Sequence, residues 1–354
     1  MRVRDAGRVL MVGFEGAEVN DHVREALALG VGGFILFTRN IQEPAQVVEL
    51  IAEIRALAPD RRLLFAVDQE GGRVTRLGPP CTVWPKMRVL GQTDDEQLAF
   101  RLGTALAAEL HALGFDLNFA PVVDVDANPD NPVIGDRSFG RDPQLVARMG
   151  AAVIKGLQSG GVLACAKHFP GHGNTDKDSH HELPVIETDE AQWRAVDLPP
   201  FAAAVAADVA AVMTAHIVPA HADDALPATL SPRVLALLRE ELRFNGMIVS
   251  DDLEMKAVAA HYEPGEAALL AARAGCDLLL VCRQWERQEA AVRALYDAHR
   301  SGALPPLRLT EMRRRIEAAA LRFPPPGKGD LSVLGCDEHH RLAAMIRQIG
   351  EERE

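Results

Sequence analysis

The chain has 354 residues, of which 48% are hydrophobic and 25% are charged, and these proportions are those of an ordinary globular protein. Its formal net charge is -12 without a long basic run, which argues against a nucleic-acid partner. No apolar run approaches the ~18 residues that cross a membrane, and residues 1–14 lack the features of a signal peptide.

The five cysteines are scattered along the chain and odd in number, which is typical of reduced thiols rather than of a disulfide framework. Cys165, Cys276 and Cys282 lie in or beside apolar runs, where cysteine behaves as a small buried hydrophobic residue. We therefore expect a cytoplasmic protein without disulfides.

Eight short apolar runs recur along the chain, each without clean alternation of apolar and polar residues. This pattern is typical of parallel strands that are buried on both faces. The runs cover residues 9–13, 33–37, 63–67, 116–120, 162–166, 209–214, 247–250 and 277–281.

Helical patterns lie between these runs, at residues 44–58, 96–113, 142–157, 234–244, 265–274 and 285–300. Asp142-Pro143 and Ser231-Pro232 are typical helix starts, because a capping side chain precedes a proline in the first turn. Strand and helix alternating eight times predicts an α/β fold, a closed (β/α)8 TIM-type barrel. An open doubly wound sheet is the alternative, but no Gly-x-Gly-x-x-Gly follows the first run.

The predicted barrel is a single domain over residues 1–323, with extended loops after strands 3, 4 and 5. Two further helical patterns, at 309–322 and 338–351, close the chain, and a Pro/Gly-rich stretch separates them. We interpret residues 324–354 as a linker and helical tail that packs on the barrel or trails from it, because so short a segment is no domain of its own.

Ionisable side chains follow nearly every run, and the C-terminal ends of barrel strands are where active sites form. We therefore expect these side chains to meet at one rim. They are Asp68 and Arg76 after the third run, Asp124 and Arg137 after the fourth, Lys167 and His168 after the fifth, His216 after the sixth, and Asp251 and Asp252 after the seventh.

This mixture of carboxylates and basic side chains indicates a polyhydroxylated substrate, since carboxylates accept sugar hydroxyls while Arg and Lys donate to oxygen atoms. By chemistry alone, either Asp251 or Asp252 could attack an acetal carbon, as in retaining glycosidases. Such a reaction needs an acid/base group near neutral pKa, which histidine provides. Asp178 and His180, in the polar loop after the fifth run, could form such a pair.

Three stretches resemble the β-N-acetylglucosaminidase branch of the family 3 glycoside hydrolases, and they occur in the expected order. They are Val67-Asp-Gln-Glu-Gly-Gly-Arg73, Lys167-His-Phe-Pro-Gly-His-Gly-Asn-Thr-Asp-Lys-Asp-Ser-His180 and Ser250-Asp-Asp-Leu-Glu-Met255. The resemblance extends from about residue 8 to about residue 300. It implies that Asp251 is the nucleophile, that His180 is the general acid/base with Asp178 as its partner, and that the sugar is bound by Asp68, Arg76, Arg137, Lys167, His168 and His216.

The resemblance further implies a retaining exo-β-N-acetylglucosaminidase that acts without a cofactor on muropeptide fragments carrying 1,6-anhydro-N-acetylmuramic acid. Its partner would be this small carbohydrate, with no membrane or nucleic acid, and the protein would be a monomer or weak oligomer. A phosphorylase using the same site is one alternative, and a sugar-binding barrel without catalysis is another. The histidine cluster matches no metal-binding spacing, so we expect no metal site.

Overall fold

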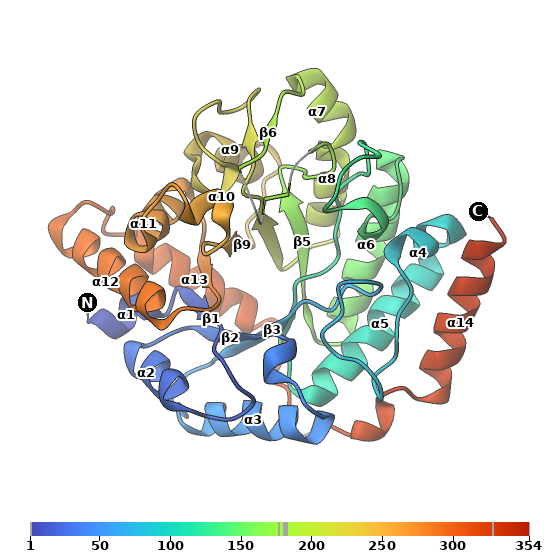
Figure 1. Ribbon diagram of the computed structural model, residues 1–354, viewed down its shortest axis with the longest axis horizontal. Coiled ribbons are helices and arrows are strands. Elements are labelled where there is room, and N and C mark those ends of the chain that lie inside the picture. The colour runs from blue at the N-terminus through green and yellow to red at the C-terminus, as the bar shows by residue number, and fades with distance from the viewer. Residues whose placement is uncertain (1, 176–177, 180–182, 328, 354) are drawn as a thin grey trace.

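The structure, a computed structural model, describes residues 2–175, 178–179, 183–327 and 329–353. Eight parallel strands close into a barrel in the order β1-β10-β9-β7-β5-β4-β3-β2 (Figure 1). This confirms the predicted (β/α)8 barrel, and each barrel strand falls on one of the eight apolar runs. The strands are β1 (Leu10–Val12), β2 (Gly33–Leu36), β3 (Leu64–Val67), β4 (Leu117–Asn118), β5 (Leu163–Phe169), β7 (Ala211–Thr214), β9 (Met247–Asp252) and β10 (Leu278–Val281).

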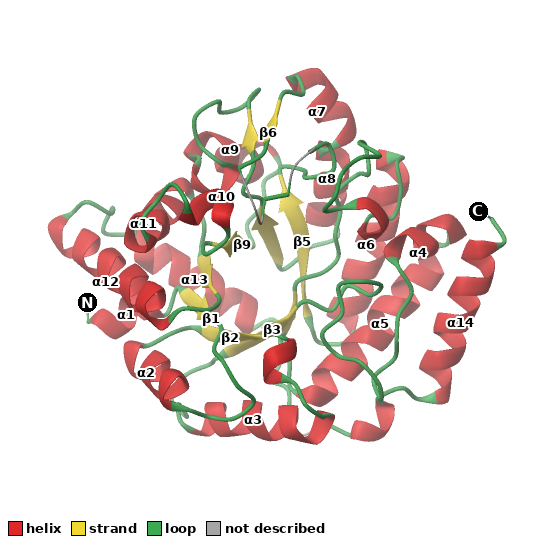
Figure 2. Cartoon of the chain, in the orientation of Figure 1, coloured by secondary structure: helices red, strands yellow, loops and turns green. Residues whose placement is uncertain are grey.

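Helices surround the barrel on its outside (Figure 2). They are α1 (Val3–Gly7), α2 (Asp21–Leu29), α3 (Pro44–Ala56), α4 (Met87–Thr93), α5 (Glu96–Leu113), α6 (Pro143–Ser159), α7 (Glu190–Val196), α8 (Leu198–Ala206), α9 (Pro232–Ala236), α10 (Lys256–Ala259), α11 (Pro264–Ala274), α12 (Trp285–Ser301), α13 (Arg308–Ala320) and α14 (Asp337–Glu351). The two expected capping signals are confirmed, because Asp142 accepts a hydrogen bond from Gln144 and Ser231 accepts one from Val234. No helix in the described part of the chain is long and apolar enough to cross a membrane.

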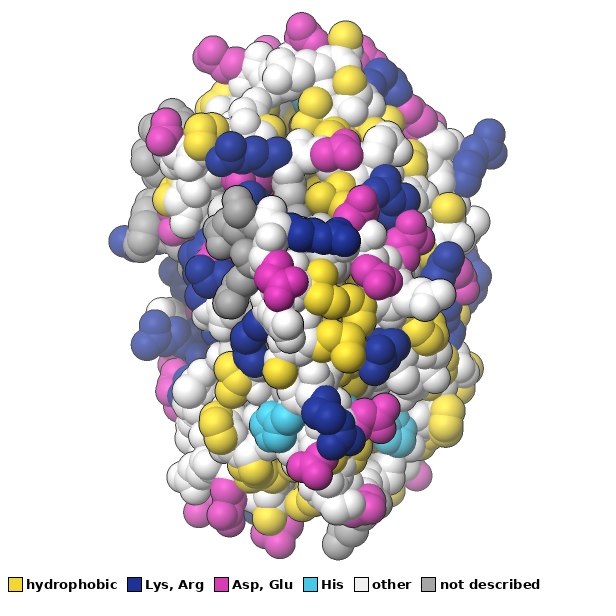
Figure 3. Space-filling model, turned by 90° about the vertical axis from the view of Figure 1, so that its right-hand side faces the viewer, with side chains coloured by type: hydrophobic (Ala, Val, Ile, Leu, Met, Phe, Trp, Pro, Cys, Tyr) yellow, Lys and Arg dark blue, Asp and Glu magenta, His cyan; other side chains and the backbone are white. Residues whose placement is uncertain are grey.

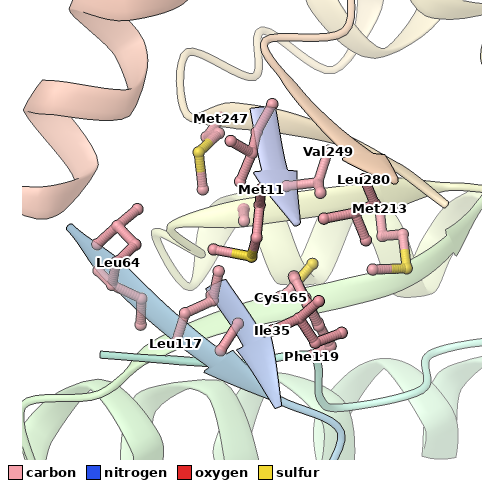
Figure 4. Close-up of a cluster of buried hydrophobic side chains, with 14 of the residues drawn as sticks. Met11, Ile35, Leu64, Leu117, Phe119, Cys165, Met213, Met247, Val249 and Leu280 are labelled. Carbon is pink, nitrogen blue, oxygen red and sulfur yellow. The ribbon is translucent and has the colours of Figure 1, made fainter. Parts of the chain in front are cut away.

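The interior of the barrel is filled by side chains from all around the sheet. Figure 4 shows Met11, Leu64, Leu117 and Met247 among the buried residues of this core. Each such side chain stabilises the fold by about 1.5–3 kcal/mol when it leaves water. The barrel is therefore a packed core and not a channel, and a ligand can be held only at its ends.

Two strands extend further than their apolar runs. β5 continues through Lys167 and His168 to Phe169, and β9 continues through Asp251 to Asp252. The prediction that these residues follow the strands was wrong, because backbone pairing continues past the apolar runs: Lys167 accepts the Val123 N–H and Asp252 pairs with Leu280. These side chains therefore project from rigid backbone. A small sheet of β6 (Val185–Ile186) and β8 (Val218–Pro219), which the sequence did not predict, lies beyond the barrel.

The opposite end of the barrel is closed by two buried carboxylates, each at the start of a strand. Asp116, before β4, accepts hydrogen bonds from Arg55 at 2.8 Å and from the backbone N–H of Phe65 at 2.8 Å. Asp277, before β10, is bonded to Arg239 and to Arg308. These ion pairs join neighbouring strands and helices at the end that carries no expected catalytic residue.

The final helix, α14, packs against α4 and α5 at the right of Figure 1. The contact centres on Glu109 of α5, a buried carboxylate that accepts hydrogen bonds from Gly335 N–H at 3.0 Å and from His339 Nδ1 at 2.9 Å. Thr82 donates to the same carboxylate. Residues 329–353 therefore pack on the barrel, while the division at residue 323 stays a prediction.

Candidate active site

A cavity of about 270 Å³ opens at the C-terminal ends of the strands. Its apolar floor is the upper layer of the barrel core, where Ile35, Phe119, Met213 and Leu280 lie (Figure 4). Its polar wall brings together most of the expected site residues, namely Asp68, Arg76, Arg137, Lys167, His168, Asp251 and Asp252, with Glu70 beside them. The prediction that these side chains share one rim is therefore confirmed for this set.

Lys167 lies at the centre of a chain of buried charges. Its Nζ is 2.8 Å from Asp68 Oδ1 and 2.7 Å from Glu70 Oε1. Arg137 binds the same Glu70 through two parallel hydrogen bonds of 2.8 Å each. Such a fork-to-fork pair holds both side chains in one orientation.

These contacts keep the network ionised although it is removed from water. Burial opposes the charge on Glu70, but Arg137 and Lys167 outweigh it and hold the pKa of Glu70 well below its usual range. Burial likewise opposes the charge on Lys167, but Asp68 and Glu70 outweigh it and raise its pKa. The cavity wall therefore offers fixed charges to a substrate over the whole neutral pH range.

Glu70 is a residue that the sequence analysis missed. It lies two positions after Asp68, in a stretch from Asp68 to Arg73 where every residue is polar or glycine, and nothing local distinguishes its role. Because it holds both Lys167 and Arg137, we expect Glu70→Gln to lower kcat/KM for the substrate of this site by about tenfold or more, which corresponds to one lost charge-assisted contact.

The measurement compares Glu70→Gln with Glu70→Asp, which keeps the charge but shortens the side chain. If Glu70 positions Lys167 and Arg137, the Glu70→Asp variant keeps part of the kcat/KM that Glu70→Gln loses. The circular dichroism of both variants should match that of the parent protein. Wild-type kinetics in Glu70→Gln would remove Glu70 from the site.

His168 is held by Asp124, a second residue to which the sequence analysis gave no role. Asp124 Oδ2 lies 2.7 Å from His168 Nδ1, and the same carboxylate accepts the backbone N–H groups of His168 and His172. Burial opposes the charge on Asp124, but the two histidines outweigh it and lower its pKa. Because Asp124 pairs with Nδ1, the other ring nitrogen of His168, Nε2, can contact a ligand in the cavity that His168 lines.

His172 shapes the polar loop. Its Nδ1 is 3.0 Å from Thr175 Oγ1 and its Nε2 is 3.0 Å from Ser179 Oγ. Burial, with the nearby His168, lowers the pKa of His172 to about 4, so the ring is neutral at pH 7. The ring therefore ties the beginning of the loop to the residue next to Asp178.

Arg76 provides a donor on the open side of the cavity. Its Nη2 lies 3.7 Å from Asp68 Oδ2, which is too long for a hydrogen bond. Its Nε is buried and has no hydrogen-bond partner among the described residues. Because Arg76 lines the cavity and its Nη2 makes no hydrogen bond to Asp68, its guanidinium group is available to a ligand oxygen.

Asp251 and Asp252 differ in what surrounds them. Asp251 Oδ1 accepts the backbone N–H of Asp252 at 2.8 Å. Asp252 Oδ1 accepts the backbone N–H groups of Glu254 at 3.1 Å and of Cys282 at 3.2 Å, as a turn cap does. Burial, together with Glu254 and Asp251, raises the pKa of Asp252 to about 7. At neutral pH a carboxyl group with this pKa is protonated in a large share of the molecules, and only its anion can attack an anomeric carbon.

The remaining expected residues are placed less completely. Asp178 is half-buried and lies next to Ser179, whereas His180 falls outside the described residues, so their pairing stays a prediction. His216 is buried, with Nδ1 2.8 Å from Thr229 Oγ1 and Nε2 2.9 Å from the carbonyl oxygen of Asp252. These contacts place His216 beside the backbone of β9. Within the described residues, no group of three His, Cys, Asp or Glu side chains could hold a metal ion.

Another buried carboxylate, Asp197, lies behind the polar loop between α7 and α8. Its Oδ1 has no hydrogen-bond partner among the described residues, and it packs so closely on Gly171 that a Cβ there would lie 2.6 Å from it. Burial, with a contribution from Asp124, raises the pKa of Asp197 to about 7. Nearby, Trp193 Nε1 donates to the carbonyl oxygen of Pro170 at 2.8 Å.

Comparison with known proteins supports a carbohydrate-active site. Residues 4–319 match the glycosyl hydrolase family 3 N terminal domain. A β-hexosaminidase of Nitrosospira multiformis is 45% identical over 293 residues, which are 80% of this chain and 82% of that protein. A β-hexosaminidase of Pseudomonas aeruginosa is 43% identical over 285 residues, which are 80% of this chain and 83% of the other.

Two solved structures extend the likeness to the fold. A family 3 β-N-acetylglucosaminidase from Paenibacillus superimposes with a TM-score of 0.94 at 41% identity, over 99% of this chain and 69% of that one. NagZ from Neisseria gonorrhoeae, in complex with N-trifluoroacetyl-D-glucosamine, superimposes with a TM-score of 0.79 at 35% identity, over 97% of this chain and 98% of that one.

Proposed function

The chain belongs to glycosyl hydrolase family 3, among the β-N-acetylhexosaminidases, and we propose that it is a retaining exo-β-N-acetylglucosaminidase. One observation carries this proposal. Asp251 lines the same small cavity as the linked charges of Asp68, Lys167 and Arg137. A nucleophile at the edge of a hydroxyl-binding wall is the arrangement that attack on a bound sugar requires.

The shape of the cavity supports action at a chain end. Its volume of about 270 Å³ is closer to the size of one sugar unit than of a polysaccharide chain. Asp68 and Lys167 would bind sugar hydroxyls, and Arg76 and Arg137 would donate to the remaining oxygen atoms. The apolar floor would take the carbon face of the ring and the acetamido methyl group.

The reaction that we propose has two steps. In the first, Asp251 attacks the anomeric carbon while His180 gives a proton to the leaving oxygen, so that the glycosidic bond breaks and a glycosyl ester forms. In the second, His180 removes a proton from water, whose oxygen attacks the same carbon and displaces Asp251. Two inversions leave the released N-acetylglucosamine with its original β configuration.

As the natural substrate, we propose a muropeptide fragment in which N-acetylglucosamine is linked to 1,6-anhydro-N-acetylmuramic acid. The family resemblance of the three sequence motifs supports this choice, and so does the likeness to NagZ of Neisseria gonorrhoeae, whose structure holds N-trifluoroacetyl-D-glucosamine. We place the reaction in the cytoplasm, with which five free cysteines agree. Purified disaccharide fragments, compared with chitobiose as the control, test this choice through the ratio of their kcat/KM values.

The activity itself is tested with p-nitrophenyl N-acetyl-β-glucosaminide, first without and then with inorganic phosphate. We expect release of nitrophenol and of free β-N-acetylglucosamine, at a rate that phosphate leaves unchanged. A rate that depends on phosphate, with N-acetylglucosamine 1-phosphate as product, would show a phosphorylase instead. No turnover of any N-acetylglucosaminide would contradict the proposal.

A second prediction concerns Asp178. If Asp178 supports the acid/base group, Asp178→Ala lowers kcat about 10²-fold or more, the usual range for general acid catalysis. KM changes little, because Asp178 is not in the sugar-binding wall.

The leaving group provides the control for Asp178. A nitrophenol or a methylumbelliferone leaves without much protonation, whereas a sugar alcohol needs a proton, so the loss in kcat/KM, which reports the first step, should grow as the leaving-group pKa rises. An equal loss for every leaving group would remove Asp178 from the proton transfer.

A further inference from the structure

Two adjoining pockets at the opposite end of the barrel are lined by arginine side chains. The first, of about 510 Å³, lies between α1, the end of α2 and the segment that follows α3. The second, of about 290 Å³, lies between that segment and α13. Because the two pockets share Arg8, Asp60 and Arg61, they form one groove, which we call the arginine groove.

The arginine groove has an excess of positive charge on a chain whose net charge is -12. Its lining comprises seven arginines and three carboxylates, namely Arg2, Arg4, Arg8, Arg24, Arg61, Arg62 and Arg313 with Asp5, Asp60 and Glu317. On the face shown in Figure 3, by contrast, basic and acidic side chains are interspersed. An uneven distribution of this kind creates a local positive potential that attracts anions.

Some of these arginines have a structural role. Arg4 Nε donates to the carbonyl oxygen of Ala28 at 2.9 Å, and Arg61 Nη2 donates to that of Leu27 at 3.0 Å, so both cap the end of α2. Arg62 is paired with Asp116 at 2.8 Å. Capping and pairing thus account for part of the cluster.

The other arginines are not explained in this way. In the described part of the chain, the side chains of Arg2 and Arg24 have no hydrogen bond or ion pair, and Nε of Arg313 is buried without a partner. Arg8 reaches Glu317 only at 3.8 Å. Burial and the neighbouring Arg8 and Arg4 lower the pKa of Arg61, which shows that the positive charges repel one another. An anion bound among them would relieve this repulsion.

We propose that the arginine groove binds a phosphate-bearing ligand, with the phosphate in the first pocket and an apolar portion in the second. Arginine suits phosphate because its planar group donates two parallel hydrogen bonds to oxygen atoms. The second pocket adds the apolar surface of Val31, Leu63, Ile316 and Ala320. A nucleoside diphosphate combines these two features in one molecule, and a phospholipid offers the same phosphate from a membrane surface.

The test titrates the full-length protein with ADP and with inorganic pyrophosphate, at about 0.15 M ionic strength so that weak surface attraction is screened. A parallel arm measures sedimentation with phosphatidylcholine vesicles that contain or lack phosphatidylglycerol. We expect saturable binding, and we expect the Arg2→Ala/Arg24→Ala variant to bind at least tenfold more weakly. Neither side chain carries a structural hydrogen bond, so folding and hydrolysis should be unchanged.

A matched control removes the same charge elsewhere. Arg101 and Arg148 are exposed on α5 and α6, and Arg101→Ala/Arg148→Ala should bind the probe like the parent protein. Binding of ADP or pyrophosphate that only the groove variant loses supports a free metabolite as ligand. Sedimentation that requires phosphatidylglycerol, and that only the groove variant loses, supports a lipid headgroup.

Three results would overturn the proposal. The first is the absence of binding to every probe, and the second is equal weakening of binding in both double variants. The third is competition with the aryl substrate, because Arg76, Arg137 and Lys167 also attract anions and a rise in KM would place the anion in the catalytic cavity. Binding in the arginine groove leaves KM unchanged, since the groove lies at the other end of a filled barrel.

Discussion

Asp251→Asn should lose hydrolysis of an aryl N-acetylglucosaminide almost completely, with kcat lowered ~10⁴-fold or more, as when a covalent nucleophile is removed. The substitution keeps the size of the side chain and the oxygen that accepts the Asp252 N–H at 2.8 Å. What it removes is the negative charge that forms the bond to the anomeric carbon. Because the sugar-binding wall is untouched, N-acetylglucosamine should still bind.

The matched control is Asp252→Asn. Asn at this position still accepts the backbone N–H groups of Glu254 and Cys282, so the turn after β9 is preserved. We expect this variant to keep most of its kcat. Mass spectrometry of a slow-substrate reaction should find the sugar on the peptide that contains both acids, and the Asp252→Asn variant should still form this adduct. A larger loss in Asp252→Asn than in Asp251→Asn would reverse the assignment.

Asp197→Asn should make the protein more stable at pH 8 and leave its stability unchanged near pH 4. The pKa of Asp197 is raised from 3.8 to about 7 by burial, together with Asp124. A group whose pKa is higher in the folded than in the unfolded state costs stability as the pH rises from the unfolded to the folded value. Here the cost begins near pH 4 and is complete above pH 7.

The size of this effect follows from the same values. A pKa raised from 3.8 to about 7 corresponds to a free energy of unfolding that is lower by on the order of 4 kcal/mol at pH 8. Asn avoids this cost because it carries no charge at any pH, while it fits the same space against Gly171. Urea unfolding of the two proteins at pH 4.5 and pH 8 measures the difference.

A control for Asp197 is Asp208→Asn, at an exposed carboxylate on the far end of the barrel from the loop. It should not produce a gain that grows with pH. If Asp197→Asn instead lowers the free energy of unfolding at pH 8, the carboxylate is paired in the folded protein. Its charge would then stabilise the loop beside Gly171.

Much of the architecture could be predicted because it depends on local patterns. Buried parallel strands are apolar on both faces, so runs such as 33–37 and 277–281 stand out from the amphipathic segments between them. Capping residues such as Asp142 and Ser231 also marked helix starts, because a cap binds backbone N–H groups within three residues and is therefore a local signal. Polar side chains after these runs then predicted the rim that Asp68, Lys167 and Asp251 share.

The unpredicted features depend on contacts between distant residues. Lys167 belongs to β5 because its carbonyl oxygen accepts the Val123 N–H at 2.8 Å, and a polar residue after an apolar run gives no sign of such pairing. Glu70 becomes important only through its contacts with Lys167 and with Arg137, which is 67 residues away. Asp197 looks like an ordinary polar residue between two helices until the approach of Gly171 buries it.

The carboxylate of Glu109 has a consequence for the order in which the chain folds. Glu109 emerges early in synthesis, yet His339, one of its hydrogen-bond donors, follows 230 positions later. Burial opposes its charge, but the hydrogen bonds from His339, Thr82 and Gly335 outweigh burial and lower the pKa of Glu109. A ribosome-bound chain that has not yet released α14 therefore exposes this face of α5, so the α5 side of the barrel reaches its final stability only after α14 has emerged.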